Sequence, residues 1–187
     1  MKLILGSKSP RRKALLQEMG FEFELRTLDT DETYPLELNV KDIAAFIAKK
    51  KAAALSSQLG VNEVILCADT IVVINNSILG KPSNKNEAIK MLELLSGKKH
   101  NVITGVCLLS TGKTHEFSVS TEVTFGVLSR ENIDHYVDTY TPFDKAGAYG
   151  IQDWIGHVAV EKIEGSYSNV VGLPTHETYL ALKQFMH

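Results

Sequence analysis

Asp69 is the most unusual charged residue in this sequence, because it interrupts EVILCADTIVVI, a run typical of a strand buried on both faces. A buried carboxylate without a partner is strongly unfavourable, so Asp69 requires a metal ion, a cation or a raised pKa. The alternative is a turn between two short strands, since Asp is a good turn residue. No Gly, Asn or Pro surrounds the position. The sequence therefore favours a functional carboxylate.

Arg11 and Arg12 lie in SPRRKALL, where Ser9 fits a helix N-cap and Pro10 fits the first helical position. Both arginines then occupy the first turn, at the positive end of the helix dipole, where cations are disfavoured. This placement predicts an anion nearby.

Two lysines are further candidates for binding an anion. Lys51 falls near the middle of the apolar face of a helix expected from about Val40 to Leu59. Its ammonium could reach the surface from the helix flank, or it could enter a cleft and pair with an anion, and the pattern favours neither. Lys81 lies in GKP, just after the apolar pair Ile78 and Leu79. The GKP pattern alone is more typical of a plain turn.

Three further polar side chains could bind a ligand. Glu32 lies in the acidic stretch DTDETYP, which could contribute a magnesium ligand but alone is typical of a solvated loop. Gln152 and Asp153 follow the first two glycines of AGAYGIQDWIG. A Gln amide both donates and accepts hydrogen bonds, as the recognition of a nucleobase requires.

Together these residues suggest metal-assisted hydrolysis of a phosphoanhydride. Cations at a helix N-terminus suit a polyphosphate, and two carboxylates suit a divalent metal while one of them activates water. The sequence contains no Walker, Rossmann, zinc-protease or nucleophile-elbow motif. Its histidines show no ligand spacing, and His100, His115 and His135 are expected at the surface or at strand ends.

The elements that must position these side chains alternate between strands and helices, which predicts an α/β fold with a mixed sheet. We expect a turn at GSYSN and the following helices and strands: strands at 2–6, 21–25, the two runs around Asp69, 102–110, 118–127 and 158–163; helices at 10–19, 40–59, 86–95, 129–140 and from about 174.

Composition limits the class of protein. The 187 residues fit one domain, 1–187, or two closely packed lobes, and 44% hydrophobic residues suffice for a core. A net charge of -2 argues against a broad nucleic-acid-binding surface. Cys67 and Cys107 suggest buried thiols in a reducing compartment. The apolar runs are too short for a signal peptide or a membrane span, so we expect a cytoplasmic protein.

The motifs SKSPRRKALL, ADT, GKP, LSGKKHNVITGV, GAYGIQD and EGSYSNVVGLP, in this order, resemble the Maf family of nucleoside triphosphate pyrophosphatases. The resemblance covers essentially the whole chain. It implies a fold shared with the inosine triphosphatase group, with an elongated mixed sheet, flanking helices and two lobes around a cleft. It also implies a homodimer, a divalent cation such as Mg²⁺ or Mn²⁺, and cleavage of a nucleoside triphosphate between the α and β phosphates. From the composition, we expect no nucleic-acid polymer and no membrane as partner.

The resemblance also implies roles for individual residues. Asp69 would be the proton acceptor and would bind the metal together with Glu32. The phosphates would be held by Ser7, Arg11, Arg12, Lys51 and Lys81. The residues implied in selecting the substrate are Arg12, Thr70 and Gln152. Asp153, beside Gln152, is a further candidate for binding the substrate.

The branch of the family can be argued from two positions. The branch similar to 7-methyl-GTP pyrophosphatases typically inserts an aromatic residue between the proline and the arginine pair, whereas here Pro10 runs directly into Arg11. Gln152 is also present in GAYGIQD. The sequence thus resembles the dTTP/UTP branch. The 7-methyl-GTP branch, a nucleotide-binding regulator of cell division without turnover, and a purely structural module are the alternatives.

Overall fold

The computed structural model describes residues 1–186 and divides into two compact units. Unit 1 comprises residues 1–70, 104–119 and the C-terminal segment from Gly172, and unit 2 comprises residues 71–103 and 120–171. Three long strands contribute residues to both units.

The strands form a seven-stranded sheet in the order β2-β1-β3-β5-β6-β7, and β4 pairs with β3. β1 runs parallel to both β2 and β3, whereas β4 is antiparallel to β3 and β7 is antiparallel to β6. The predicted mixed sheet with flanking helices is therefore confirmed. The strands are β1 (Lys2–Leu5), β2 (Phe23–Leu25), β3 (Glu63–Ile74), β4 (Ser77–Leu79), β5 (Lys99–Ser110), β6 (Lys113–Phe125) and β7 (Val160–Glu164).

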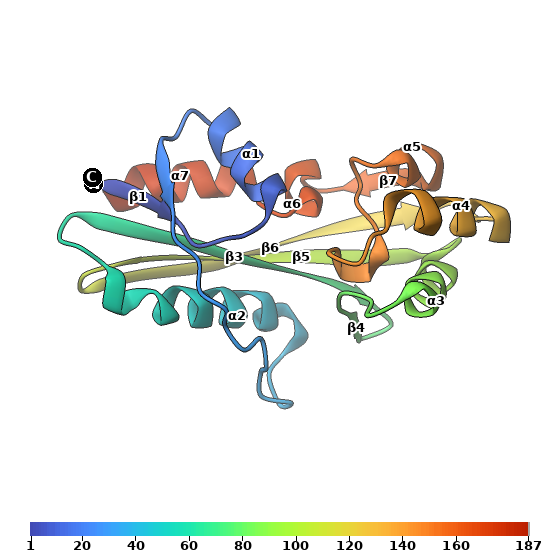
Figure 1. Ribbon diagram of the computed structural model, residues 1–187, viewed down its shortest axis with the longest axis horizontal. Coiled ribbons are helices and arrows are strands. Elements are labelled where there is room, and N and C mark those ends of the chain that lie inside the picture. The colour runs from blue at the N-terminus through green and yellow to red at the C-terminus, as the bar shows by residue number, and fades with distance from the viewer. Residues whose placement is uncertain (187) are drawn as a thin grey trace. The chain divides into compact units, whose positions relative to one another are not determined.

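In unit 1, helices cover both faces of the strands (Figure 1). One face packs against α1 and α7 through a core that includes Leu16, Leu66 and Leu182. The other face packs against α2, where a Cβ on Gly105 of β5 would lie only 2.1 Å from the backbone nitrogen of Ala45. Glycine is therefore required for α2 to approach β5. The helices are α1 (Pro10–Glu18), α2 (Val40–Ala54), the 3₁₀ turn η1 (Ser56–Gln58) and α7 (Thr175–Met186).

Unit 2 has its own core, in which aromatic residues such as Phe125, Tyr136 and Tyr149 pack among aliphatic side chains. The glycine-rich segment forms a 3₁₀ turn and a short helix around this core. The helices are α3 (Lys85–Leu95), α4 (Arg130–Tyr140), the 3₁₀ turn η2 (Ala146–Ala148), α5 (Trp154–Ala159) and α6 (Tyr167–Val171).

Several local expectations are corrected. β3 runs without a break through Asp69, so the alternative of a turn there is wrong. The helix expected to reach Leu59 ends at Ala54. The GSYSN segment leads directly into α6, because the Ser166 hydroxyl accepts the backbone N–H of Asn169 in the helical turn that begins there.

The described part of the chain contains no helix that is long and apolar enough to cross a membrane. Cys67 and Cys107 are free and buried, as expected. Burial raises the pKa of the Cys67 thiol to about 12, which makes it an unreactive core side chain.

Candidate active site

The centre of the site in unit 1 is the Lys51 triad, which we define as Glu32, Lys51 and Asp69. The Lys51 ammonium lies 2.6 Å from Asp69 Oδ1 and 2.7 Å from Glu32 Oε1. Asp69 is 8% exposed in the middle of β3, and the side chain of Lys51 is 17% exposed. The structure thus favours the second interpretation of Lys51, in which its ammonium pairs with anions rather than reaching open solvent.

Three separate segments build the triad. The Asp69 backbone is held by the strand ladder of β3, and Lys51 comes from the last turn of α2, where a cation also suits the helix dipole. Glu32 belongs to a loop that is anchored nearby, because Lys50 contacts Asp31 Oδ2 at 2.9 Å and the carbonyl oxygen of Thr33 at 3.1 Å. Burial of one carboxylate is therefore compensated by a cation from a different element.

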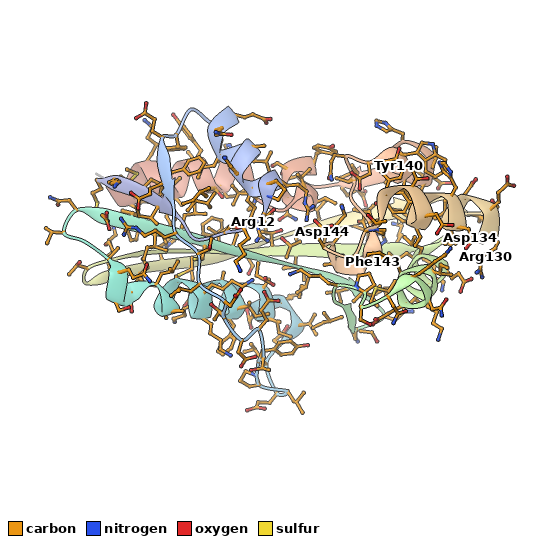
Figure 2. The ribbon with its side chains drawn as sticks, in the orientation of Figure 1. Arg12, Arg130, Asp134, Tyr140, Phe143 and Asp144 are labelled. Carbon is orange, nitrogen blue, oxygen red and sulfur yellow. The ribbon has the colours of Figure 1, made fainter. Side chains whose placement is uncertain are left out.

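A second group, the Arg12 network, joins the first helix to the sheet of unit 1. The Nε atom of Arg12 donates to the carbonyl oxygen of Gly172 at 2.8 Å, and Nη2 donates to Thr70 Oγ1 at 3.0 Å. Nη1 lies 3.4 Å from the hydroxyl oxygen of Ser7. Thr70 is itself hydrogen-bonded to the buried hydroxyl of Thr104 at 2.9 Å. Figure 2 shows Arg12 between α1 and the strands of unit 1.

The Arg12 network explains in part how a cation is accommodated at the positive end of the α1 dipole. Burial lowers the pKa of Arg12, whereas the nearby charge of Asp69 raises it. Ser9 caps α1 by accepting the backbone N–H of Arg12, as the sequence predicts. Three of the five N–H bonds of the guanidinium are directed at protein oxygens, so Arg12 both braces this end of α1 and retains donors for a ligand.

In unit 2, the GKP turn and the glycine-rich segment lie together. The backbone N–H of Gly147 donates to the carbonyl oxygen of Gly80 at 3.0 Å, directly beside the exposed Lys81. Gly147 and Ala148 have φ angles of 68° and 60°, and a Cβ on Gly147 would lie 2.9 Å from Val72. A left-handed backbone at a non-glycine residue such as Ala148 is strained, which is common where a loop serves a function.

The same segment is held by the Tyr136 clamp, which we define as Tyr136, Gly150, Gln152 and Asp153. The Tyr136 hydroxyl accepts the backbone N–H of Gly150 at 3.0 Å and donates to Asp153 Oδ2 at 2.8 Å. The other oxygen of Asp153 accepts from Nε2 of Gln152 at 3.1 Å. Burial raises the pKa of Tyr136, so its hydroxyl remains a donor at neutral pH.

The buried His100 is hydrogen-bonded to Tyr149, the residue that precedes Gly150 of the clamp. His100 Nε2 and the Tyr149 hydroxyl are hydrogen-bonded at 2.8 Å, and both rings make edge contacts with Phe125. His100 lies at the start of β5, so the expected strand-end position is confirmed, but its ring is 1% exposed and not at the surface. Burial lowers its pKa to about 4, which keeps the ring neutral at pH 7.

Sequence reasoning missed the roles of Tyr136, His100 and Tyr149. Buried aromatic residues at helical or strand spacing look like ordinary core, and their hydroxyl and ring-nitrogen contacts appear only in three dimensions. The signal that could have identified them is a polar tip on a residue predicted to be fully buried, since such a group requires a partner.

Residues 2–185 match the model of the family described as Maf-like protein. This chain belongs to the Maf family. The resemblance found in its motifs is thereby confirmed.

Two relatives are similar to this chain over nearly their whole length. A protein from Phocaeicola vulgatus named dTTP/UTP pyrophosphatase is 50% identical over 98% of this chain and 95% of its own. A protein of the same name from Porphyromonas gingivalis is 46% identical over 98% of this chain and 94% of its own. Among solved structures, a HAM1 protein from Coxiella burnetii aligns over 98% of this chain and 99% of its own, with a TM-score of 0.51 and 15% identity. That likeness concerns the fold alone.

The two carboxylates of the Lys51 triad are candidate ligands for a divalent metal ion. Within residues 1–186, no group of three or more His, Cys, Asp or Glu side chains could hold a metal ion. Mg²⁺, however, commonly binds one or two protein carboxylates and completes its shell with substrate phosphates and water. Glu32 and Asp69, which converge on one ammonium, fit that requirement.

Proposed function

We propose that this Maf protein hydrolyses UTP and dTTP to the nucleoside monophosphate and pyrophosphate, with Asp69 as the proton acceptor. The observation that carries the proposal is the buried Asp69 of β3 in contact with Lys51, whose ammonium also contacts Glu32. Relatives named dTTP/UTP pyrophosphatase, at 45% to 50% identity over nearly the whole chain, support the choice of substrate.

In this mechanism, Asp69 orients the attacking water and accepts its proton. Lys51 balances the charge of Asp69, because its ammonium lies 2.6 Å from one carboxylate oxygen. Glu32 and Asp69 would hold a divalent cation, Mg²⁺ or Mn²⁺, which would supply charge neutralisation at the phosphate oxygens. The cation and the ammonium together would offset part of the negative charge of the two carboxylates and of the triphosphate.

The remaining polar residues are assigned to substrate binding. Arg11, Arg12 and Lys81 would bind phosphate oxygens, and the hydroxyl of Ser7 would add a donor. Thr70 would take part in substrate choice, and its hydroxyl is already oriented by Arg12. Gln152 would read the edge of the base, since an amide can pair with both the O4 oxygen and the N3–H group of uracil or thymine.

We further propose that the protein acts in the cytoplasm as a homodimer with one Maf-like domain, 1–187, and without a nucleic-acid polymer as partner. The resemblance to the family supports the homodimer, and the match of one family model to residues 2–185 supports the single domain. The net charge of -2 argues against a nucleic-acid partner, and the free buried thiols support a reducing compartment. Light scattering coupled to size-exclusion chromatography would measure a mass near twice 20.6 kDa. A mass near 20.6 kDa at all concentrations would contradict the homodimer.

The test of the activity is pyrophosphate release from a panel of UTP, dTTP, CTP, GTP and 7-methyl-GTP, with and without Mg²⁺. We expect the highest kcat/KM with UTP and dTTP and loss of activity on chelation. Turnover of 7-methyl-GTP alone would assign the chain to the other branch of the family. Binding of nucleotides without any turnover would instead indicate a nucleotide-dependent regulator.

A further inference from the structure

Asp153 occupies the N-cap position of α5, yet its carboxylate makes no capping hydrogen bond. Asp is a favoured N-cap residue because its side chain can accept a backbone N–H of the first turn. Here both oxygens bind other groups: Oδ2 accepts from the Tyr136 hydroxyl at 2.8 Å and Oδ1 accepts from Gln152 Nε2 at 3.1 Å. The carboxylate is therefore committed to the Tyr136 clamp rather than to the helix.

The clamp leaves Asp153 little freedom. Tyr136 is fully buried, and its hydroxyl is fixed from the other side by the backbone N–H of Gly150 at 3.0 Å. The ammonium of Lys145 lies 3.8 Å from Asp153 Oδ2, and Lys145 also pairs with Asp144 at 2.7 Å. Two neighbours thus hold one oxygen of Asp153, and the other oxygen faces the exposed side chain of Gln152.

A carboxylate can only accept hydrogen bonds, so the end of the Gln152 amide that faces Asp153 must be the nitrogen. One N–H of Nε2 is used in this contact. The amide still offers its second N–H and its carbonyl oxygen, but the order of this donor and acceptor is no longer free to reverse. An unrestrained glutamine could rotate its amide end for end and present either order.

That order distinguishes pyrimidines. Uracil and thymine present a carbonyl oxygen at C4 beside an N–H at N3, whereas cytosine presents an amino group at C4 beside an acceptor at N3. If the sugar fixes the base in one orientation, an amide nitrogen facing C4 pairs with uracil and thymine and opposes cytosine. Discrimination by such a bidentate pair is roughly five- to 150-fold.

We infer that Asp153 is a specificity-determining residue, which fixes the amide orientation of Gln152 so that uracil and thymine nucleotides are accepted and cytosine nucleotides are rejected. This inference rests on the proposed function, in which Gln152 reads the base. Asp153 acts through Gln152 and does not itself contact the nucleotide.

The test is Asp153→Asn, with kcat/KM measured for UTP and CTP. The Tyr136 hydroxyl still needs an acceptor, so the oxygen of the introduced amide would take that side and its nitrogen would face Gln152. Gln152 must then turn its own oxygen toward that nitrogen and reverse the order that it presents. We expect the CTP/UTP ratio of kcat/KM to rise at least tenfold, through a fall for UTP and a gain for CTP.

Tyr136→Phe is the matched control. It removes the hydroxyl that holds Asp153 but leaves a carboxylate facing Gln152. We expect lower turnover of both nucleotides with an unchanged CTP/UTP ratio. If Asp153 has only a structural role, Asp153→Asn will lower both activities in the same proportion, and that result would overturn the inference.

If Asp153→Asn does not fold, Gly150→Ala provides a second variant. A Cβ on Gly150 would lie 2.6 Å from both Gln152 Nε2 and Asp153 Oδ2, so it would displace the pair without changing its charges. We expect this variant to lose discrimination between UTP and CTP, and an unchanged ratio would contradict the inference.

The proposed function can fail separately. If the wild-type protein binds nucleotides but hydrolyses none of them, the same ratios are measured as dissociation constants by calorimetry. Tighter binding of UTP than of CTP, lost in Asp153→Asn, would support the inference without turnover. Equal binding of UTP and CTP by the wild-type protein would overturn it.

Discussion

The Lys51 triad in unit 1 holds its buried carboxylate with a cation, whereas the Tyr136 clamp in unit 2 holds its carboxylate mainly with a buried hydroxyl. An ammonium contributes charge but little directional restraint, and it can share its hydrogen bonds with an incoming ligand. A tyrosine hydroxyl fixed by a backbone N–H contributes direction instead. The difference fits a triad that manages charge during a reaction and a clamp that fixes the geometry of recognition.

Asp69→Asn breaks the triad most severely. An amide cannot accept the proton of the attacking water, so we expect kcat to fall about 10²- to 10⁴-fold, the usual contribution of a general base. Nucleotide binding, measured by calorimetry, should persist. The matched control is Asp29→Asn, whose carboxylate is 95% exposed and pairs with Lys8 at the surface. Unchanged turnover in Asp69→Asn would remove Asp69 from the mechanism.

Lys51→Met tests whether the triad also stabilises the fold. Removing the cation leaves a buried carboxylate unpaired, and we expect the free energy of unfolding to fall by about 3 kcal/mol. Lys49→Met, on the same helix, removes an exposed pair with Glu116 and should cost less than about 1 kcal/mol. Urea denaturation of both variants measures the difference, and equal losses would show that Lys51 behaves as a surface lysine.

His100 provides a test in unit 2, because its neutral ring is hydrogen-bonded to Tyr149 beside the clamp. Its pKa is about 4 in the fold, below the ordinary value of 6.5, so the unfolded chain binds the proton first as the pH falls. Stability contributed by the neutral ring is therefore lost between about pH 6.5 and pH 4, and the full difference amounts to about 3 kcal/mol.

The comparison variant is His100→Gln, which keeps a hydrogen-bonding group but does not titrate. Urea denaturation from pH 7 to pH 4 should show a smaller loss of unfolding free energy for His100→Gln than for the wild-type protein. Parallel pH profiles for the two proteins would contradict the assignment of the buried ring.

The two regions also differ in how far the sequence could predict them. Asp69 and Lys51 were identifiable because a charge in an apolar pattern requires a partner, and the structure supplies that partner. The strand order, the small-residue contact of Gly105 with α2, and the short helix α6 depend on tertiary packing that local patterns do not contain. The burial of His100 escaped prediction because its neighbours in the sequence are polar while its ring lies in the core.

The most direct measurement of the central claim is ³¹P NMR of the wild-type protein incubated with UTP and Mg²⁺. We expect the triphosphate resonances to be replaced by those of UMP and pyrophosphate in equal amounts, which would place the cleavage between the α and β phosphates. Formation of UDP and inorganic phosphate, or persistence of UTP, would contradict it.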